Sequence, residues 1–269
     1  MSATIYLHEL RARMRSVLIW SFSLAVLIWL FFSIFPGFAS QTAVINQMMS
    51  KFPPALLEAF GMGRTNLATV VGFYGFVFIF VQLCLAIQAG NYGFGMVSVE
   101  EAEWTADFLL SKPVSRTQVL TSKVLAALSS LTITNAVVWA VTFLSIALYH
   151  GKYSYTAGPL VLLLVSIVIF QLFFMTVGLV ISLLVKRVRS VTPYSLGLGF
   201  GMYVLAAFTG MFGTSALEYI TPFKHFDPAY IVQNNRYDTP LVMINIAVSL
   251  IALGVSYWRY IRRDVPAVA

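Results

Sequence analysis

The amino-acid sequence predicts an all-α membrane protein that forms a single transmembrane domain over residues 1–269. Hydrophobic residues make up 59% of the chain and charged residues only 10%, whereas about 25% of a soluble domain is charged. The apolar residues gather in six long runs, without the alternation that a strand would show. Because such a chain cannot cover a water-facing surface, its helices must lie in lipid, where each satisfies its own backbone hydrogen bonds.

Each of the six apolar runs is long enough to cross a bilayer as a helix. Proline and glycine at Pro36-Gly37 are expected to end the first span. The glycines at 90, 93 and 95 are expected to break the second. The predicted spans cover about residues 17–35, 67–89, 124–148, 158–185, 191–211 and 240–258.

Residues 1–16 are expected to form an amphipathic elbow helix that lies on the membrane before the first span begins. Apolar side chains recur there at helical spacing, and the basic side chains occupy another face. The apolar run 17–35 is long for a signal peptide and no convincing cleavage site follows it, so we expect it to remain as a span. The two faces are Tyr6, Leu10, Met14 and Val17 on one side and His8, Arg11 and Arg15 on the other.

Basic residues indicate the orientation of the spans. If the N-terminus is inside, 12 of the 17 lysines and arginines fall on inner segments, and the reverse orientation would violate the positive-inside rule. We therefore predict that both termini and the loop after the second span are cytoplasmic. The inner set is Arg11, Arg13, Arg15, Lys112, Arg116, Lys123, Lys186, Arg187, Arg189, Arg259, Arg262 and Arg263.

Residues 97–116, which we call the docking segment, form the one large inner loop. Ser98 followed by Glu101 is a capping box, which predicts the start of a new helix. Three carboxylates share one face of this helix and two aromatic rings share another, so we expect it to lie in the interface with its carboxylates toward the cytosol. The predicted docking residues of this coupling helix are Glu100, Glu101, Glu103, Trp104, Asp107 and Phe108.

A proline break divides the docking segment. The residue before Pro113 avoids the helical region, so the helix should end there. Ser115 with Gln118 is a second capping box and opens the third span. Arg116 then lies at the positive end of a helix dipole, which suggests a partner carboxylate or a lipid phosphate, or else a positive-inside anchor. The elbow residues are Ser111, Pro113, Ser115 and Arg116.

Polar and small residues inside the spans are expected to hold helices together. The amides of Gln82, Gln88 and Asn91 should bond neighbouring helices. Gly197 and Gly201 form a GxxxG pair, which allows another helix to approach closely. This packing seam could lie inside one subunit or between two subunits, and the sequence favours neither.

Three other features predict no chemistry. The loop over residues 212–239 is rich in proline and aromatic residues and should be compact and close to the membrane. Within it, His225 and Asp227 are too few to form a metal site. The single cysteine, Cys84, cannot form an intrachain disulfide and is expected to serve packing alone.

Several function classes are excluded or disfavoured. The sequence contains no GxxxxGK[ST] motif, so it binds no ATP through a P-loop. The net charge of +7 is explained by loops that face an anionic leaflet and does not indicate nucleic acid. An intramembrane protease with an EExxxR motif would need arginine at position 105 after Glu100-Glu101, where Thr105 stands instead. No charge lies near the middle of any span, so an ion-coupled carrier is poorly supported. A cytoplasmic docking helix on a bundle without its own energy source suggests that the energy for transport comes from a bound partner.

Residues 100–128, EEAEWTADFLLSKPVSRTQVLTSKVLAAL, resemble the segment after the second span of ABC-2 type transporter permeases. In that family an acidic helix is followed by a leucine pair, a Pro-x-Ser-Arg turn and a lysine. Trp104 departs from the pattern, because the family usually has glycine there. Segments 53–61 and 221–228 also look like outer-loop segments of these permeases. The matching positions are Leu109, Leu110, Ser111, Pro113, Ser115, Arg116 and Lys123.

The resemblance implies the permease subunit of an ATP-driven exporter in the plasma membrane. Apolar spans with few amides are compatible with export of a hydrophobic or amphiphilic solute, but they do not choose among such solutes. The resemblance also implies two cytoplasmic ABC ATPase subunits on the docking segment and a second permease copy or paralogue, with spans one, two and five at the subunit seam. ATP and magnesium would bind the partner, so the chain itself would be no enzyme and bind no cofactor. The alternative is a membrane anchor that tethers an ATPase or an assembly factor without transport.

Overall fold

The structure is a computed structural model, and its described residues confirm the predicted all-α membrane fold. It describes residues 2–53, 65–102, 114–185, 190–212 and 215–262, together with Leu57 and Met62. No strand occurs among these residues, and six of their helices are long and apolar enough to cross a membrane. These helices are α1 (Ala3–Ser40), α4 (Val70–Ala102), α6 (Arg116–Tyr149), α7 (Ala157–Leu184), α8 (Val191–Phe212) and α12 (Thr239–Arg262).

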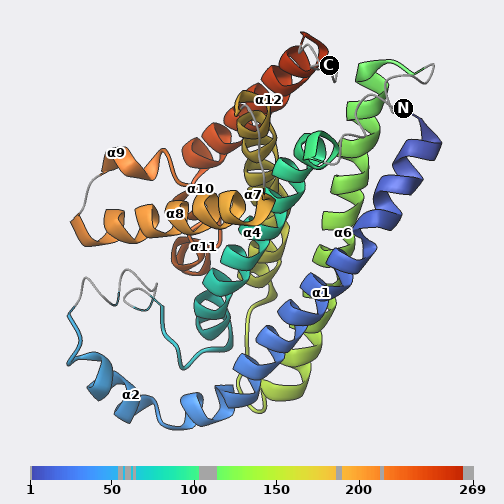
Figure 1. The fold of residues 1–269 in the computed structure, drawn as a ribbon. Coiled ribbons are helices and arrows are strands. Elements are labelled where there is room, and N and C mark those ends of the chain that lie inside the picture. Colours follow the sequence, from blue (N-terminus) through green and yellow to red (C-terminus); the bar gives the residue numbers. More distant parts are fainter. Residues whose placement is uncertain are drawn as a thin grey trace.

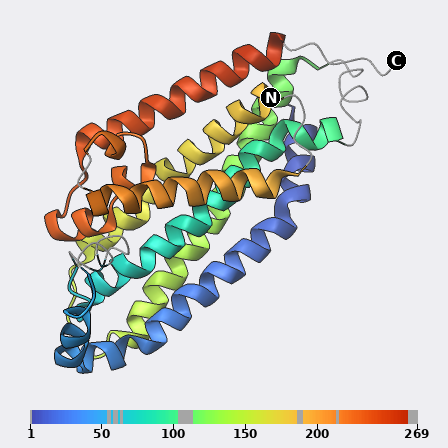
Figure 2. The same ribbon diagram turned by 60° about the vertical axis from the view of Figure 1, so that its left-hand side comes forward.

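Helix α4 lies at the centre of the bundle (Figure 1). It packs along α7 and α8 and also contacts α1 and α6. Helix α1 pairs with α6 along much of its length, and α12 covers α7 (Figure 2). The first turn of α1 and the last described turn of α12 lie at the same end of the bundle, which we call the terminal end (Figures 1 and 2).

Helix α1 departs from the predicted boundaries at both of its ends. It is continuous from Ala3 to Ser40, so there is no break at residue 16 and Pro36 lies inside the helix. Phe35 and Phe38 flank this proline and both rings pack against Phe73 of α4, which supports the helix on either side of it. The two predicted faces of residues 1–16 are confirmed, since the basic face is exposed and the apolar face turns inward.

The predicted break of the second span at its glycines is wrong, because α4 continues to Ala102. A Cβ atom on Gly93 would collide with the backbone carbonyl of Met175 on α7, and one on Gly90 would lie 3.3 Å from the Ser195 side chain on α8. Helix α7 also has a glycine at this contact, since a Cβ on Gly178 would lie 3.2 Å from the Gly90 carbonyl oxygen. These glycines therefore serve the close approach of α4 to its neighbours, and the helix hydrogen bonds are kept.

The segment between α8 and α12 is compact, as predicted, and folds against the bundle. It contains three short helices, α9 (Ser215–Glu218), α10 (Pro222–His225) and α11 (Pro228–Asn234). The Gln82 side-chain amide on α4 donates to the Phe226 carbonyl at 2.9 Å, and the Thr221 hydroxyl donates to the Met202 carbonyl at 2.8 Å. These bonds attach the segment to α4 and α8 at the end opposite the terminal end.

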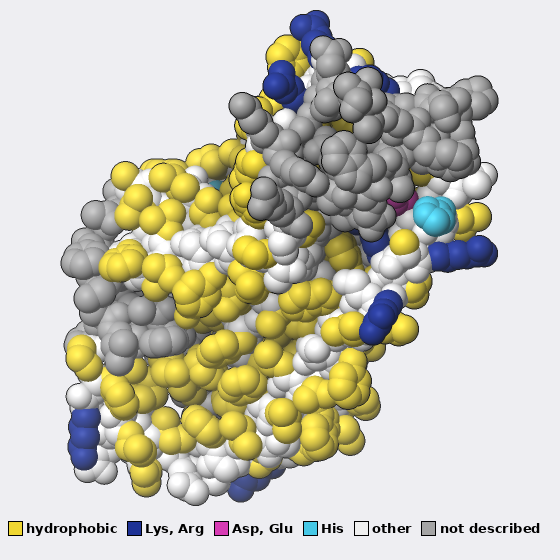
Figure 3. All heavy atoms as spheres, in the orientation of Figure 1, with side chains coloured by type: hydrophobic (Ala, Val, Ile, Leu, Met, Phe, Trp, Pro, Cys, Tyr) yellow, Lys and Arg dark blue, Asp and Glu magenta, His cyan; other side chains and the backbone are white. Residues whose placement is uncertain are grey.

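The remaining loop follows α1. Helix α2 (Thr42–Met49) begins it, and the short helix predicted over residues 53–60 lies largely outside the described residues. On the face shown in Figure 3, apolar side chains form a broad band, and the lysines and arginines lie mainly toward the two ends. This distribution is expected of a protein whose middle lies in hydrocarbon.

Candidate functional site

Most of the docking segment lies outside the described residues. Glu100 and Glu101 belong to the last turn of α4, although nothing is described of their side chains. The predicted helix start at Ser98 is wrong, because Ser98 lies inside α4, which continues to Ala102 without a break. The other predicted positions outside the description are Glu103, Trp104, Asp107, Phe108, Ser111 and Pro113.

The second predicted helix start is confirmed. Ser115 is the N-cap of α6, and its hydroxyl accepts the Gln118 backbone N–H at 3.2 Å. The Gln118 side chain accepts the Ser115 backbone N–H at 3.1 Å in return. This reciprocal capping box satisfies two N–H groups that the first turn of a helix leaves open, so the chain re-enters the bundle at a fixed residue.

Arg116 lies beside the end of α12. Its guanidinium donates to the Ile261 carbonyl at 3.2 Å. Carbonyl groups in the last turn of a helix have no helical partner and carry partial negative charge. Arg116 therefore ties the beginning of α6 to the end of α12, a contact that the sequence prediction did not foresee.

The Gly197–Gly201 pair does not pack against the described part of the chain. A Cβ atom on either glycine would meet nothing within 4 Å. The α8 glycine that faces α4 is Gly199, whose Cβ would lie 3.0 Å from the Ile87 side chain. Of the two alternatives for the GxxxG pair, packing within one subunit is thus wrong for the described residues, and a subunit interface stays a prediction.

His225 and Asp227 do not form a common site. The imidazole of His225 is buried, with Nε2 3.2 Å from the Tyr219 carbonyl and Nδ1 3.3 Å from the Asn245 amide. Burial lowers the pKa of His225, so a neutral ring with Nε2–H as donor fits both contacts. Asp227 instead caps α11 by accepting the Ala229 N–H at 2.9 Å. Both residues therefore stabilise the segment before α12.

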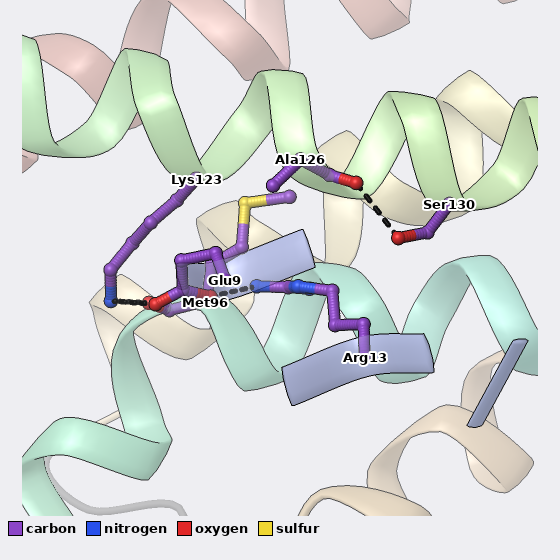
Figure 4. A network of polar contacts seen from close by, with 6 residues as sticks. All are labelled: Glu9, Arg13, Met96, Lys123, Ala126 and Ser130. Atoms are coloured by element: carbon purple, nitrogen blue, oxygen red, sulfur yellow. Dashed lines mark hydrogen bonds and ion pairs between the residues drawn. The ribbon is translucent and has the colours of Figure 1, made fainter. Parts of the chain in front are cut away.

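The most unusual polar group in the described structure is Lys123, which is 2% exposed within α6. Its ammonium donates to the Met96 carbonyl of α4 at 2.6 Å and lies 3.8 Å from the Glu9 carboxylate of α1. Arg13 donates to the same carboxylate at 2.8 Å. Figure 4 shows these side chains converging from three helices. We call Glu9, Arg13, Met96 and Lys123 the terminal cluster, because they lie toward the terminal end.

The terminal cluster continues into the bundle through α4. The Arg13 guanidinium lies 5.6 Å from the centre of the Tyr92 ring, and the Tyr92 hydroxyl donates to Ser16 at 3.3 Å. One turn earlier, the Gln88 amide donates to the Thr134 hydroxyl of α6 at 2.9 Å. The predicted role of the span amides is confirmed for Gln88, which bonds a neighbouring helix. Polar contacts therefore join α1, α4 and α6 over several turns.

Sequence reasoning placed Lys123 among the inner basic residues and in the family pattern, but not in a buried cluster. The only local signal was the spacing of Glu9 and Arg13, four residues apart on a helix, which permits an ion pair. The contacts of Lys123 with Glu9 and Met96 join distant parts of the chain, and no sequence period reveals them. No group of three or more metal-binding side chains occurs among the described residues. The contacts of the terminal cluster join α1, α4 and α6, so the cluster is suited to holding these helices together.

Comparison with known proteins agrees with this architecture. A family model described as "ABC-2 family transporter protein" matches residues 3–265, which is nearly the whole chain. No curated protein matches the sequence. The match includes all six membrane-length helices, the docking segment and the terminal cluster. The chain belongs to the ABC-2 transporter family, a family of membrane components of transport systems.

Proposed function

We propose that this chain is the permease subunit of an ATP-driven exporter that moves a hydrophobic or amphiphilic solute out of the cell. One observation carries the proposal: the family match extends over residues 3–265, yet the sequence has no P-loop. A transport protein without a nucleotide site of its own takes its energy from elsewhere. We assign ATP and magnesium to separate cytoplasmic ABC ATPase subunits.

The docking segment is the proposed attachment site for these ATPases. The chain itself is proposed to lie in the plasma membrane with its N-terminus inside the cell. The two roots of the docking segment, the end of α4 and the beginning of α6, lie at the terminal end of the bundle, close to the first turn of α1. Several arginines gather at the same end, which supports an inner location by the positive-inside rule. The described ones are Arg11, Arg13, Arg15, Arg116, Arg259 and Arg262.

In the proposed transport cycle the helix bundle alternates between two conformations. ATP binding closes the ATPase subunits against each other and displaces the docking segment. The bundle then shifts between openings toward the inside and toward the outside, as a rigid-body rearrangement of packed helices. Membrane lipid surrounds the assembly.

A second copy of the chain, or a paralogue, is proposed to complete the permease. The described parts of α1 and α8 leave large apolar side chains exposed, including Phe22 at 72% and Phe200 at 54%. Such surfaces face either lipid or another subunit. The open glycines of α8 favour a helix partner there, because small residues allow backbones to approach closely.

Charge reversal in the docking segment should release the ATPase. We expect the triple variant Glu100→Lys, Glu103→Lys, Asp107→Lys to insert into membranes at the wild-type level but to lose the co-purifying ATPase, because three carboxylates that face the partner become cations. The measurement is the amount of ATPase, by mass spectrometry and ATP hydrolysis, that follows the tagged permease from membranes.

A matched control is Glu218→Lys in α9, which reverses one charge at the opposite end of the bundle and should keep the ATPase. Retention of the ATPase at wild-type stoichiometry by the triple variant would contradict the proposed attachment site. If no ATPase accompanies the wild-type chain either, the permease function itself is wrong.

The open glycines of α8 give a test of the second subunit. Isoleucine at Gly197 and Gly201 should hold two α8 helices apart and lower the crosslinked dimer about tenfold, which corresponds to a loss of about 1.4 kcal/mol of association free energy. Crosslinking in native membranes measures this yield. Gly254→Ile on α12 is the control, because its Cβ also meets nothing within 4 Å. An unchanged dimer yield would reject an α8 seam.

The alternative function, a membrane anchor without transport, predicts a different response to solutes. In proteoliposomes, the ATPase activity of an anchored complex should be the same with and without added amphiphiles. A transporter should show stimulation by the solute that it moves, because binding favours one state of the cycle.

A further inference from the structure

Lys123 joins the two roots of the docking segment. The docking segment begins at residue 97, near the end of α4, and ends at Arg116, where α6 begins. The Lys123 ammonium, two turns into α6, donates to the Met96 carbonyl at 2.6 Å. The two helices that carry the docking segment are thus connected by one buried hydrogen bond just before α4 enters the segment.

The same ammonium connects both roots to α1. The Glu9 carboxylate lies 3.8 Å from Lys123 and accepts Arg13 at 2.8 Å, so it stands between two cations (Figure 4). The residue directly before Lys123 makes a second contact with α1, because the Ser122 hydroxyl accepts the Ser2 backbone N–H at 2.9 Å. Further along α6, the Tyr6 and Ser129 hydroxyls are 2.9 Å apart. The beginning of α1 is therefore attached to the beginning of α6 by polar contacts in addition to apolar packing.

A lysine at this position carries a cost that simple packing would avoid. Burial of an ammonium group is unfavourable unless partners replace its water, and apolar residues of similar volume often stabilise such a site equally well. Hydrogen bonds and ion pairs are directional, so they fix the positions of two helices relative to each other. Apolar contacts alone allow the helices to slide along each other more easily. The position of Lys123, at the roots of the docking segment, suggests that this fixed geometry is used in coupling.

We propose that Lys123 is a positioning residue that clamps both roots of the docking segment to α1, so that displacement of the segment by a partner moves α1 as well. This inference rests on the proposed function. Without the clamp, local bending at the end of α4 would absorb the displacement. Helix α1, which exposes a broad apolar surface, is then the first part of the bundle to respond.

Lys123→Met removes the clamp with little other disturbance. Methionine has a similar length and no charge, so it fills the same space. Glu9 keeps its ion pair with Arg13, and the Met96 carbonyl keeps the N–H that an α-helix supplies from residue 100. We therefore expect this variant to assemble.

The test measures movement of α1 in the intact permease–ATPase complex in nanodiscs. Cys84→Ala removes the only cysteine, and spin labels are placed at Arg11→Cys on α1 and Arg259→Cys on α12, both exposed. We expect trapping with ATP and vanadate to change the label distance with Lys123 present and to change it clearly less in Lys123→Met, where only the contacts between α1 and α6 remain. The ATPase stoichiometry and the KM for ATP should stay at the wild-type values, a split that a general loss of structure would not produce.

Ser130→Ala is the matched control. Ser130 is also buried in α6, but its hydroxyl donates to the Ala126 carbonyl of its own helix at 2.8 Å, so its loss should leave the distance change intact. Should Lys123→Met fail to assemble, Lys123→Gln, which keeps a polar group without the charge, is measured in its place.

The outcomes separate the two proposals. An unchanged α1 response without Lys123 would overturn the clamp while leaving the permease function in place. A wild-type complex that hydrolyses ATP without moving α1 would also overturn the clamp. A wild-type chain that brings no ATPase would instead overturn the permease function, and the clamp with it.

Discussion

Replacement of Gly93 by alanine should destabilise the bundle by about 3 kcal/mol or more, at the upper end of the usual cost of overpacking a core. A Cβ atom there would collide with the Met175 carbonyl and lie 3.1 Å from the Leu179 backbone nitrogen. Both contacts are to the backbone of α7, which cannot rotate away as a flexible side chain could. The central pair of helices, α4 and α7, would have to separate.

The measurement is the free energy of unfolding in detergent micelles, followed by helix content during denaturant titration. Gly37→Ala on α1 is the matched control, because a Cβ there meets nothing within 4 Å and the change to alanine removes flexibility from a helix. Equal stability of Gly93→Ala and the wild type would show that α4 and α7 are not in backbone contact.

Glu9→Gln should destabilise the chain by about 3 kcal/mol, the lower end of the cost of breaking a buried ion pair, since the Glu9 side chain keeps 19% exposure. The change leaves Lys123 and Arg13 as two cations without the carboxylate between them. The same titration in detergent measures the loss.

The double variant Glu9→Gln, Lys123→Met tests whether repulsion between Lys123 and Arg13 causes the loss of stability. The double variant should be more stable than Glu9→Gln alone, because the repulsion between the two cations is gone and the effects of contacting residues are not additive. Glu218→Gln in α9 is the control for loss of a carboxylate outside the cluster, and it should leave stability nearly unchanged. Additive losses in the double variant would mean that Glu9 and Lys123 do not interact.

The sequence by itself determined the number and type of the spanning elements. Lipid leaves a chain no partner for exposed backbone groups, so each apolar run of sufficient length must be a helix. The beginning of α6 was also predictable, because Ser115 and Gln118 lie three residues apart and satisfy each other locally. The exposed and inward faces of residues 1–16 followed from helical periodicity alone.

Only the tertiary structure decided what the glycines and the charges do. Gly90 and Gly93 look like helix breakers, yet they lie within α4 because α7 and α8 approach them. Lys123 resembles a surface anchor, yet it is buried because Glu9 and Met96, far away in sequence, supply its partners. The role of a glycine or of a charged residue depends on the residues that it contacts in the folded protein. Those contacts are set by how the helices pack.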